Sequence, residues 1–474
     1  MKNLTLSNIA NACGGKLYCT KTELLKIEAT SVVTDSRKVT PNGIFIAVPG
    51  EKVDGHSFIP QVVEMGALAV VCEKEPTEAD TPYILVDNSL IALKKIAAFY
   101  RMQLDIPVIG ITGSVGKTST KEFIAGTLGA KYNVLKTAGN FNNEIGLPLT
   151  ILSIQPEHEI AVVEMGISDF GEMSRLADIA KPDTCVITNI GQCHLENLID
   201  RDGVLQAKTE VFYYMNHRGM ILLNGDDDKL LTKTKPWSRN IMRFGHSEEF
   251  QVYPTDIVNC GLMGTDVTMH FNQLEVAGQS LDTAFSETEL VRGGELSVHV
   301  PLPGAHMVNN AMAAAAVALE YGLTFDEIKR GIESVEATAG RSHVIKTDDY
   351  TLIDDCYNAN PVSMRAAIDL LGLANGRKVA VLGDMFELGE DEAKLHFGVG
   401  EYAAINGVDV LVCIGELAAN MYEAASKRID NVYLYPDVAS GIEGLSQVLK
   451  KDDSVLLKAS HGMHFENILK ELVG

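Results

Sequence analysis

The chain has 474 residues, which is too long for one hydrophobic core and predicts two or three domains. Its 40 Lys and Arg against 63 Asp and Glu give a formal net charge of −23, the opposite of the basic balance that nucleic-acid binding favours. The longest apolar run, residues 311–319, is too short to span a bilayer. Asn8, Asn11 and Lys16 argue against a signal peptide, and the eight cysteines, without CxxC spacing, suit a reducing compartment. We therefore expect a cytoplasmic protein with no membrane span and no nucleic-acid partner.

Residues 1–105 alternate short β-like runs with helical stretches. The β-like runs are 44–48, 67–72 and 84–86, and a helix is expected over 89–100. This pattern predicts a smaller N-terminal α/β domain.

A glycine-rich loop follows, between an apolar run over 108–112 and a helix expected over about 119–128. It consists of Gly113, Ser114, Val115, Gly116, Lys117, Thr118 and Ser119. In such loops backbone N–H groups and the helix N-terminus cradle phosphates, the lysine reaches the β- and γ-phosphates, and the threonine hydroxyl ligates Mg²⁺. The usual pattern has a glycine five residues before Gly116, where Ile111 stands here, so Gly113 takes up the turn. We predict that ATP or GTP binds this loop, in preference to an ordinary strand-to-helix turn.

Near-continuous apolar runs between helices continue through a central domain expected over 106–335. The runs are 160–164, 184–190 and 220–224, and they predict a mostly parallel, doubly wound sheet. Polar and apolar residues alternate between 252 and 300, which predicts an antiparallel addition, and an Ala-rich helix is expected over 309–321.

The last segment, 336–474, repeats this style and predicts a Rossmann-like C-terminal domain. Its strands are expected at 352–354, 378–382, 408–414 and 454–458. It has no second Gly-Lys-Thr sequence. A domain built to bind ligands at its strand ends, but without its own phosphate loop, suits the second substrate.

Three single residues invite a chemical interpretation. Glu164 ends an apolar strand, where it would coordinate Mg²⁺ or, equally well on sequence grounds, be a solvated strand end. His194 follows the next strand and would face the phosphates or be an ordinary loop residue. Lys208 lies on an expected helix, and taken alone it is better explained as a surface charge.

Three polar turns are equally ambiguous when considered one by one. They are the amide-rich run 137–146, the Asn-Gly-Asp-Asp-Asp turn over 224–228, and the Asp-Cys-Tyr-Asn-Ala-Asn-Pro segment over 355–361. Each is either a turn-forming loop or a set of polar ligand contacts.

Taken in order, these segments resemble the Mur ligases, ATP-dependent amide-forming enzymes of peptidoglycan precursor synthesis. The resemblance runs along essentially the whole chain. It includes Thr-Asp-Ser-Arg at 34–37, the phosphate loop, Gly-Asn-Phe-Asn-Asn-Glu-Ile-Gly at 139–146, Glu-Met-Gly-Ile-Ser at 164–168, Ala-Lys-Thr-Glu at 207–210, Gly340 with Arg341, Leu-Gly-Asp-Met-Phe-Glu-Leu-Gly at 382–389 and Lys-Ala-Ser-His-Gly-Met at 458–463.

The resemblance implies roles for many residues. Lys117 and Thr118 would hold ATP phosphates and Mg²⁺, and Asn143, Glu164 and His194 would surround two metal sites. Lys208 matches the family lysine that is carbamylated, which makes it a carboxylate-like Mg²⁺ ligand in place of a surface charge. Adenine and ribose would contact Asn224, Asp226 and Asn310, while Arg341 and Asp355 would approach the nucleotide from the last domain.

The resemblance also implies the substrates, UDP-N-acetylmuramoyl-tripeptide and D-alanyl-D-alanine. Separately, we expect the protein to be a monomer. The first domain would bind the uridine diphosphate end, and the last would bind the dipeptide. The candidate substrate residues are Ser36, Arg37, Asn140, Asn358, Asn360, Lys458 and Ser460. The third-residue-adding Mur ligase carries Asp-Asn-Pro-Arg in its last domain, whereas Asn-Ala-Asn-Pro stands at 358–361 here, which favours the dipeptide-adding activity.

The expected chemistry is activation of the tripeptide carboxylate as an acyl phosphate, followed by attack of the dipeptide amine. Because water would hydrolyse that intermediate, we expect the last domain to close onto the ATP domain. The alternatives are the third-residue-adding ligase, a folylpolyglutamate synthase-like ligase, a switch GTPase or transport ATPase, and a nucleotide-binding scaffold. No Asn-Lys pair is present for guanine selection.

Overall fold

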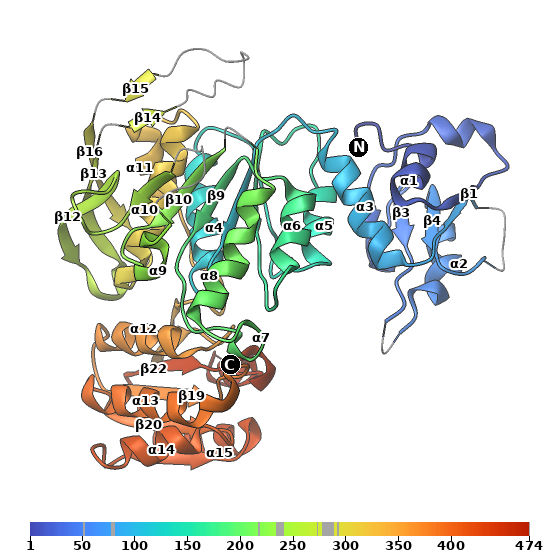
Figure 1. Ribbon diagram of the computed structural model, residues 1–474. Helices are drawn as coiled ribbons and strands as arrows, with labels where there is room; N and C mark the ends of the chain where they lie inside the picture. Colours follow the sequence, from blue (N-terminus) through green and yellow to red (C-terminus); the bar gives the residue numbers. More distant parts are fainter. Residues whose placement is uncertain are drawn as a thin grey trace.

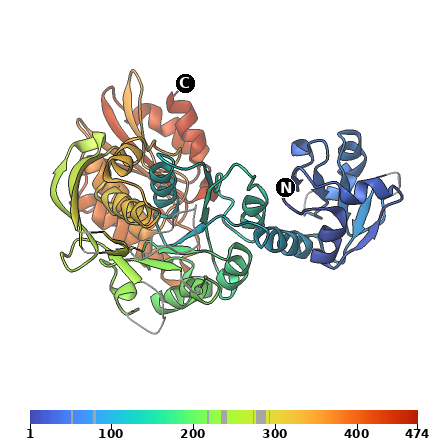
Figure 2. The same ribbon diagram turned by 90° about the horizontal axis from the view of Figure 1, so that it is seen from above.

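The computed structural model describes residues 1–50, 53–76, 81–216, 219–233, 241–272, 274–276, 289–291 and 293–473. Its strands form three large α/β sheets that follow one another along the chain. The N-terminal part lies to one side of the central part, and the C-terminal part packs beneath it (Figures 1 and 2). The three-domain α/β fold predicted from the sequence is thereby confirmed.

The N-terminal sheet has the order β1-β5-β4-β3-β2 and is parallel except for β1. Its strands are β1 (Lys16–Tyr18), β2 (Val32–Val33), β3 (Ile44–Ile46), β4 (Ala69–Cys72) and β5 (Tyr83–Leu85), and its helices are α1 (Leu6–Cys13), α2 (Ile59–Glu64) and α3 (Ser89–Arg101). The three predicted strands are present, each shifted or shortened by one or two residues at its ends. Helix α3 packs against α5 and α6 of the central part, so one apolar core continues across this boundary.

The central sheet has nine strands in the order β16-β13-β12-β11-β10-β9-β6-β8-β7. The parallel strands are β6 (Val108–Thr112), β7 (Val134–Lys136), β8 (Ile160–Glu164), β9 (Thr184–Ile187), β10 (Met220–Asn224) and β11 (Ile241–Phe244). In β8, Ile160 and Val162 belong to one hydrophobic cluster while Ala161 and Val163 belong to the other. Both faces of the sheet are therefore covered, which is why the inner positions of its central strands are mostly apolar.

The antiparallel addition extends one edge of this sheet. It consists of β12 (Val252–Asn259), β13 (Thr265–Phe271) and β16 (Gly294–Val300), and a separate hairpin is formed by β14 (Leu274–Val276) and β15 (Glu289–Val291). The helices of the central part are α4 (Lys117–Leu128), α5 (Gly146–Leu152), α6 (Glu172–Ala180), α7 (Leu195–Leu198), α8 (Arg201–Thr209), α9 (Asp228–Leu231), α10 (Ala305–Glu320) and α11 (Phe325–Glu333). The Ala-rich α10 packs closely on α4, and it begins four residues before the predicted start.

The C-terminal sheet has the order β17-β18-β22-β19-β20-β21, with only β17 antiparallel. Its strands are β17 (His343–Lys346), β18 (Tyr350–Asp354), β19 (Lys378–Gly383), β20 (Val410–Ile414), β21 (Val432–Tyr435) and β22 (Asp453–Lys458). Its helices are α12 (Pro361–Gly372), α13 (Glu392–Ile405), α14 (Ala419–Ala425), α15 (Val438–Val448) and α16 (Glu466–Val473). This is the Rossmann-like arrangement that the sequence predicts.

Among the described residues, two of the contacts between the C-terminal part and the central part are the following. Leu262, in the short turn between β12 and β13, packs against the C-terminal core together with Leu373. Helix α7 lies against the turn Gly389–Asp391, called η6. The carboxyl ends of the central strands therefore face the C-terminal domain.

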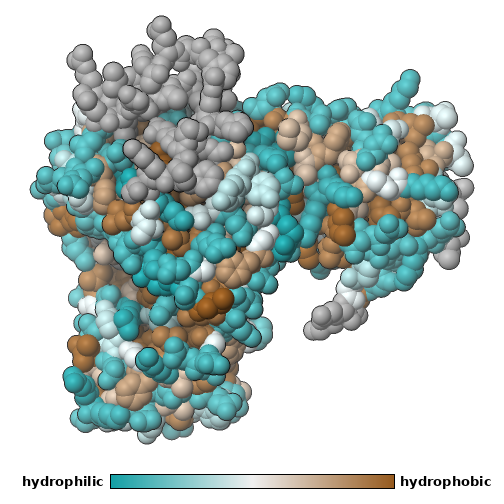
Figure 3. Space-filling model, viewed as in Figure 1, coloured by the Kyte–Doolittle hydropathy of each residue, from teal (hydrophilic) through white to brown (hydrophobic). Residues whose placement is uncertain are grey.

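The outer surface is mostly hydrophilic on the face shown in Figure 3, with apolar residues in small groups. Across the described ranges, no helix has the length and apolar character needed to cross a membrane.

Candidate active site

The phosphate loop connects β6 to α4. Gly116 has φ 81° and precedes α4, which begins at Lys117, two residues earlier than predicted. The helix N-terminus therefore points into the loop. Gly113 has φ 149°, and a Cβ there would lie 1.9 Å from Thr188 Oγ1, so only glycine fits between the loop and β9. Lys117 Nζ donates a hydrogen bond of 2.8 Å to Gly113 O across the loop.

Glu164 is held beside the loop and is not a solvated strand end, because only 1% of its surface is exposed. Its Oε2 accepts a hydrogen bond of 2.9 Å from Thr118 Oγ1, and its Oε1 accepts one of 2.8 Å from Asn142 Nδ2. Its backbone N–H donates to Thr137 Oγ1. A buried carboxylate and a hydroxyl thus converge next to the lysine, as an oxygen-ligated cation requires.

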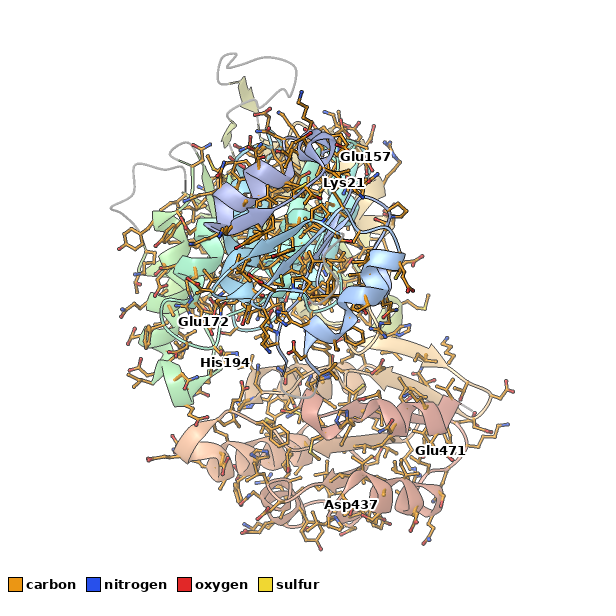
Figure 4. All side chains as sticks on the ribbon, turned by 90° about the vertical axis from the view of Figure 1, so that its right-hand side faces the viewer. Lys21, Glu157, Glu172, His194, Asp437 and Glu471 are labelled. Atoms are coloured by element: carbon orange, nitrogen blue, oxygen red, sulfur yellow. The ribbon has the colours of Figure 1, made fainter. Side chains whose placement is uncertain are left out.

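His194 marks the edge of the central domain that faces the C-terminal domain (Figure 4). Its Nδ1 lies 2.6 Å from Glu387 Oε2, although Nδ1 makes no well-angled hydrogen bond in the described structure. Burial lowers the imidazole pKa, and nearby Lys208 and Lys117 lower it further, while Glu387 opposes them.

Lys208 lies on α8 with only 1% of its surface exposed, so the surface-charge interpretation is wrong. Burial lowers its pKa to about 8, and the Lys117 ammonium acts in the same direction. Among the described residues, Lys208 forms no ion pair with a carboxylate and lines neither the 720 Å³ cavity described next nor the smaller one beside it. It lies close enough to His194 and Lys117 for the charges to influence one another.

A cavity of about 720 Å³ opens between the central and C-terminal domains. From the central domain it is lined by the phosphate loop (Ser114 to Ser119), Asn143, Glu164, His194, Asn224 and Asn310. Asn224 donates to Thr188 O, and Asn310 Oδ1 accepts from Thr120 Oγ1 at 2.9 Å. Asp226 does not line the cavity; it pairs with His246 at 2.8 Å behind Asn309.

The C-terminal domain completes the cavity with Arg341, Asp355, Asn358, Asn360 and Lys458. The Arg341 guanidinium stacks 4.0 Å from the centre of the Tyr357 ring and is close enough to Lys117 to lower its pKa, although burial lowers that pKa more. Asp355 pairs with Lys458 at 2.5 Å, and Lys458 Nζ also donates to Asn358 O. Asn360 caps α12.

A smaller cavity of about 250 Å³ adjoins it, and Ser460 lies in its wall. Ser114, Lys117, His194, Asn358 and Glu387 line both cavities. The two spaces therefore meet at the phosphate loop.

Ser36, Arg37 and Asn140, which were predicted to bind substrate, line neither cavity. The Arg37 side chain is exposed and pairs with Asp35 at 2.8 Å. The neighbouring Lys38 ammonium lies 5.8 Å from the Phe141 ring centre, so this N-terminal segment does reach the amide-rich loop. The N-terminal domain also contacts this loop through Lys94, whose Nζ lies 2.7 Å from Glu144 Oε1.

Some contributing residues were not singled out from the sequence. Asn142 holds Glu164, and Asn189 Oδ1 accepts from the Val115 N–H of the phosphate loop at 3.0 Å. Tyr357 supports Arg341, and Glu387 reaches His194. Asn142 lies within the amide-rich run 137–146, and the composition of that run is the sequence feature that could have pointed to it. The roles of Asn189, Tyr357 and Glu387 depend on contacts between distant segments, which the sequence does not show.

Three family models match the chain. The Mur ligase middle domain matches residues 111–318, the Mur ligase glutamate ligase domain matches 340–461, and the Mur ligase catalytic domain matches 28–101. The chain belongs to the Mur ligase family.

Relatives and solved structures match over nearly full lengths. The UDP-N-acetylmuramoyl-tripeptide--D-alanyl-D-alanine ligase of Bacillus subtilis is 36% identical, covering 99% of this chain and 98% of that protein. A crystal structure of MurF from Acinetobacter baumannii has a TM-score of 0.84 at 30% identity, covering 99% and 98% of the two chains. MurF ligase from Thermotoga maritima in complex with ADP has a TM-score of 0.77 at 29% identity, covering 93% and 96%.

Proposed function

We propose that this protein joins D-alanyl-D-alanine to UDP-N-acetylmuramoyl-tripeptide with consumption of ATP, forming a peptide bond, ADP and phosphate. The observation that carries the chemistry is the cavity in which the phosphate loop of one domain faces Arg341 of another. The choice of substrates is supported by full-length similarity to the ligases of that printed name.

The first half of the reaction transfers the γ-phosphoryl group of ATP to the tripeptide carboxylate. Phosphoryl transfer depends on charge neutralisation and in-line placement more than on covalent help from the protein. Lys117 and Arg341 supply positive charge from opposite sides of the cavity, and the amide groups of the loop, together with the N-terminus of α4, supply the rest.

The residues present fit Mg²⁺ beside the nucleotide. Magnesium bound with phosphates takes only one or two protein ligands and several oxygens from substrate and water. Accordingly, no group of three or more His, Cys, Asp or Glu in the described chain would hold a metal alone. Thr118 and Glu164 would hold one ion and His194 the second, and bound Mg²⁺ would neutralise the charge that develops on the phosphoryl oxygens.

Carbamylated Lys208 would add a ligand for the second ion. Carbamylation requires the neutral amine, and a pKa of about 8 leaves far more of it near neutral pH than an ordinary lysine has. The product is an anion, which suits a buried position beside cationic Lys117 and a metal ion.

Each of the three domains would bind a different substrate or part of a substrate. Residues 1–105 would bind the uridine diphosphate end through Ser36 and Arg37, with Asn140 near the peptide. Residues 106–335 would bind ATP, with Asn224, Asp226 and Asn310 around adenosine. Residues 336–474 would receive the dipeptide through Asn358, Asn360, Lys458 and Ser460, with Asp355 at the nucleotide; the chain would act as a cytoplasmic monomer.

The test is phosphate release assayed with ATP, UDP-muramoyl-tripeptide and D-alanyl-D-alanine, each omitted in turn. We expect release only when all three are present. Release that does not require the dipeptide would contradict the proposal. Release only after UDP-muramoyl-dipeptide with diaminopimelate or lysine, or a folate with glutamate, replaces the two substrates would identify a third-residue-adding or folylpolyglutamate-type ligase.

A further inference from the structure

Glu387 lies where the two cavities meet and lines both of them. It lies in the loop between β19 and α13 with φ 61°, a left-handed conformation that non-glycine residues rarely adopt. Its side chain is 62% exposed and lines both cavities. A strained residue that directs a carboxylate toward a reaction chamber is a candidate for function.

The other carboxylates of the larger cavity are already engaged. Glu144 pairs with Lys94 and Arg175, Glu164 accepts from Thr118 and Asn142, Glu172 accepts from the backbone at Ser168, and Asp355 pairs with Lys458. Among the described residues, the one charged partner of Glu387 is the His194 imidazole, across the domain boundary, and this contact lacks hydrogen-bond angles.

Glu387 is also the single acidic side chain among the described residues that line the smaller cavity. The basic groups there are Lys117, His194 and His461. Without Glu387, this space would repel a positively charged group.

The incoming dipeptide carries such a charge until its ammonium group loses a proton and becomes the nucleophilic amine. An α-amino group has a pKa of about 8, so the dipeptide arrives mostly as an ammonium ion at neutral pH. It must be brought to the carbonyl carbon at the phosphate loop from the side of the C-terminal domain. An ammonium ion in a partly enclosed space requires a carboxylate partner, because charge-assisted hydrogen bonds offset its lost hydration.

We propose that Glu387 binds the ammonium group of the incoming dipeptide and places its nitrogen at the junction of the two cavities, beside the phosphate loop. This inference rests on the proposed function and adds a substrate-binding residue to it. The carboxylate comes from the C-terminal domain, so the nucleophile and that domain arrive together.

The test is Glu387→Gln, which keeps the size of the side chain and removes its charge. We expect the KM for D-alanyl-D-alanine to rise about 10- to 100-fold, the usual loss for a hydrogen bond to a charged group. The KM for ATP and that for the UDP-linked substrate should stay within about two-fold. Glu390→Gln is the matched control, because Glu390 is exposed on the same loop and lines neither cavity.

A second measurement separates charge recognition from a general structural role. The dipeptide analogue in which a hydroxyl replaces the ammonium is tested as an inhibitor competing with D-alanyl-D-alanine. Its inhibition constant should be the same, within about two-fold, for the wild type and Glu387→Gln. Equal weakening of the analogue and the dipeptide would overturn the inference.

An unchanged dipeptide KM in Glu387→Gln, or a rise confined to the KM for ATP, would also overturn it. Either result would leave the proposed function intact, since the wild type would still require the dipeptide. A wild-type enzyme that releases phosphate without the dipeptide would instead contradict the proposed function, and this inference with it.

Discussion

The two halves of the active site are built differently. On the central side, Lys117, Thr118 and Glu164 are connected by hydrogen bonds within one sheet and its loops. On the C-terminal side, Arg341 and Glu387 reach the cavity only because their domain is docked through Leu262 and the η6 turn. The proposed nucleotide contacts on the central side therefore come from one domain, whereas the geometry of the proposed phosphoryl transfer depends on how two domains sit together.

The largest effect on activity should come from a substitution in the central half of the active site. Lys117→Ala removes the cation that the loop directs at the phosphates, and we expect kcat/KM to fall about 10³-fold with weaker ATP binding. Phosphate release and nucleotide titration measure both. Lys131→Ala is the control, because Lys131 donates to Gly322 O away from the cavity; an equal loss there would contradict the assignment.

Removing the Arg341 guanidinium, which comes from the C-terminal domain, should separate ATP binding from phosphoryl transfer. Arg341→Ala should lower kcat about 10²-fold while ATP affinity, measured by titration, changes less than about three-fold. Arg365→Ala is a matched control, because Arg365 also stacks on a tyrosine, Tyr402, but outside both cavities. A parallel loss of ATP affinity in Arg341→Ala would show that the halves are not separable.

A Lys208 variant tests whether this buried lysine contributes to the central half of the active site. Lys208→Ala should lower kcat about 30-fold, the scale typical of groups that orient a metal site, and short carboxylates should restore part of it. In the wild type, ¹³C-bicarbonate should label the lysine increasingly from pH 6.5 to 8.5, because the neutral amine accumulates as the pH rises through its pKa of about 8. Full activity in the alanine variant, or no carbamate signal by ¹³C NMR, would dismiss this role.

The smallest effect should come from the docking contact. Leu262→Ala removes apolar area between the domains, and a loss of about 1 kcal/mol would lower kcat/KM about five-fold. ATP affinity should not change, since the central half stays intact. Met263→Ala is the control, because that side chain is 67% exposed. A five-fold loss in the control as well would remove the docking explanation.

The same division decides what the sequence could predict. The phosphate loop and the apolar strands follow from local patterns, and the structure places them as expected. The position of Glu164 at the end of β8 also follows from the pattern, but its burial beside the loop does not. Lys208 was ambiguous, since a helical lysine becomes buried only through packing from other segments. Glu387 and Tyr357 lie in segments already noted from the sequence, 382–389 and 355–361. Neither residue was singled out, because their contacts with His194 and Arg341 join different segments of the chain. Ser36 and Arg37 remain predictions, because they line neither cavity.

We propose that the two halves of the active site together convert the tripeptide carboxylate into an acyl phosphate. The most direct measurement uses tripeptide substrate labelled with ¹⁸O in its terminal carboxylate, followed by mass spectrometry of the released phosphate. One labelled oxygen in each phosphate is the predicted result, because the carboxylate oxygen that attacks phosphorus leaves with it. Unlabelled phosphate would contradict this mechanism. The label would then be found in unreacted tripeptide, or with one labelled oxygen in the new amide and the other in water.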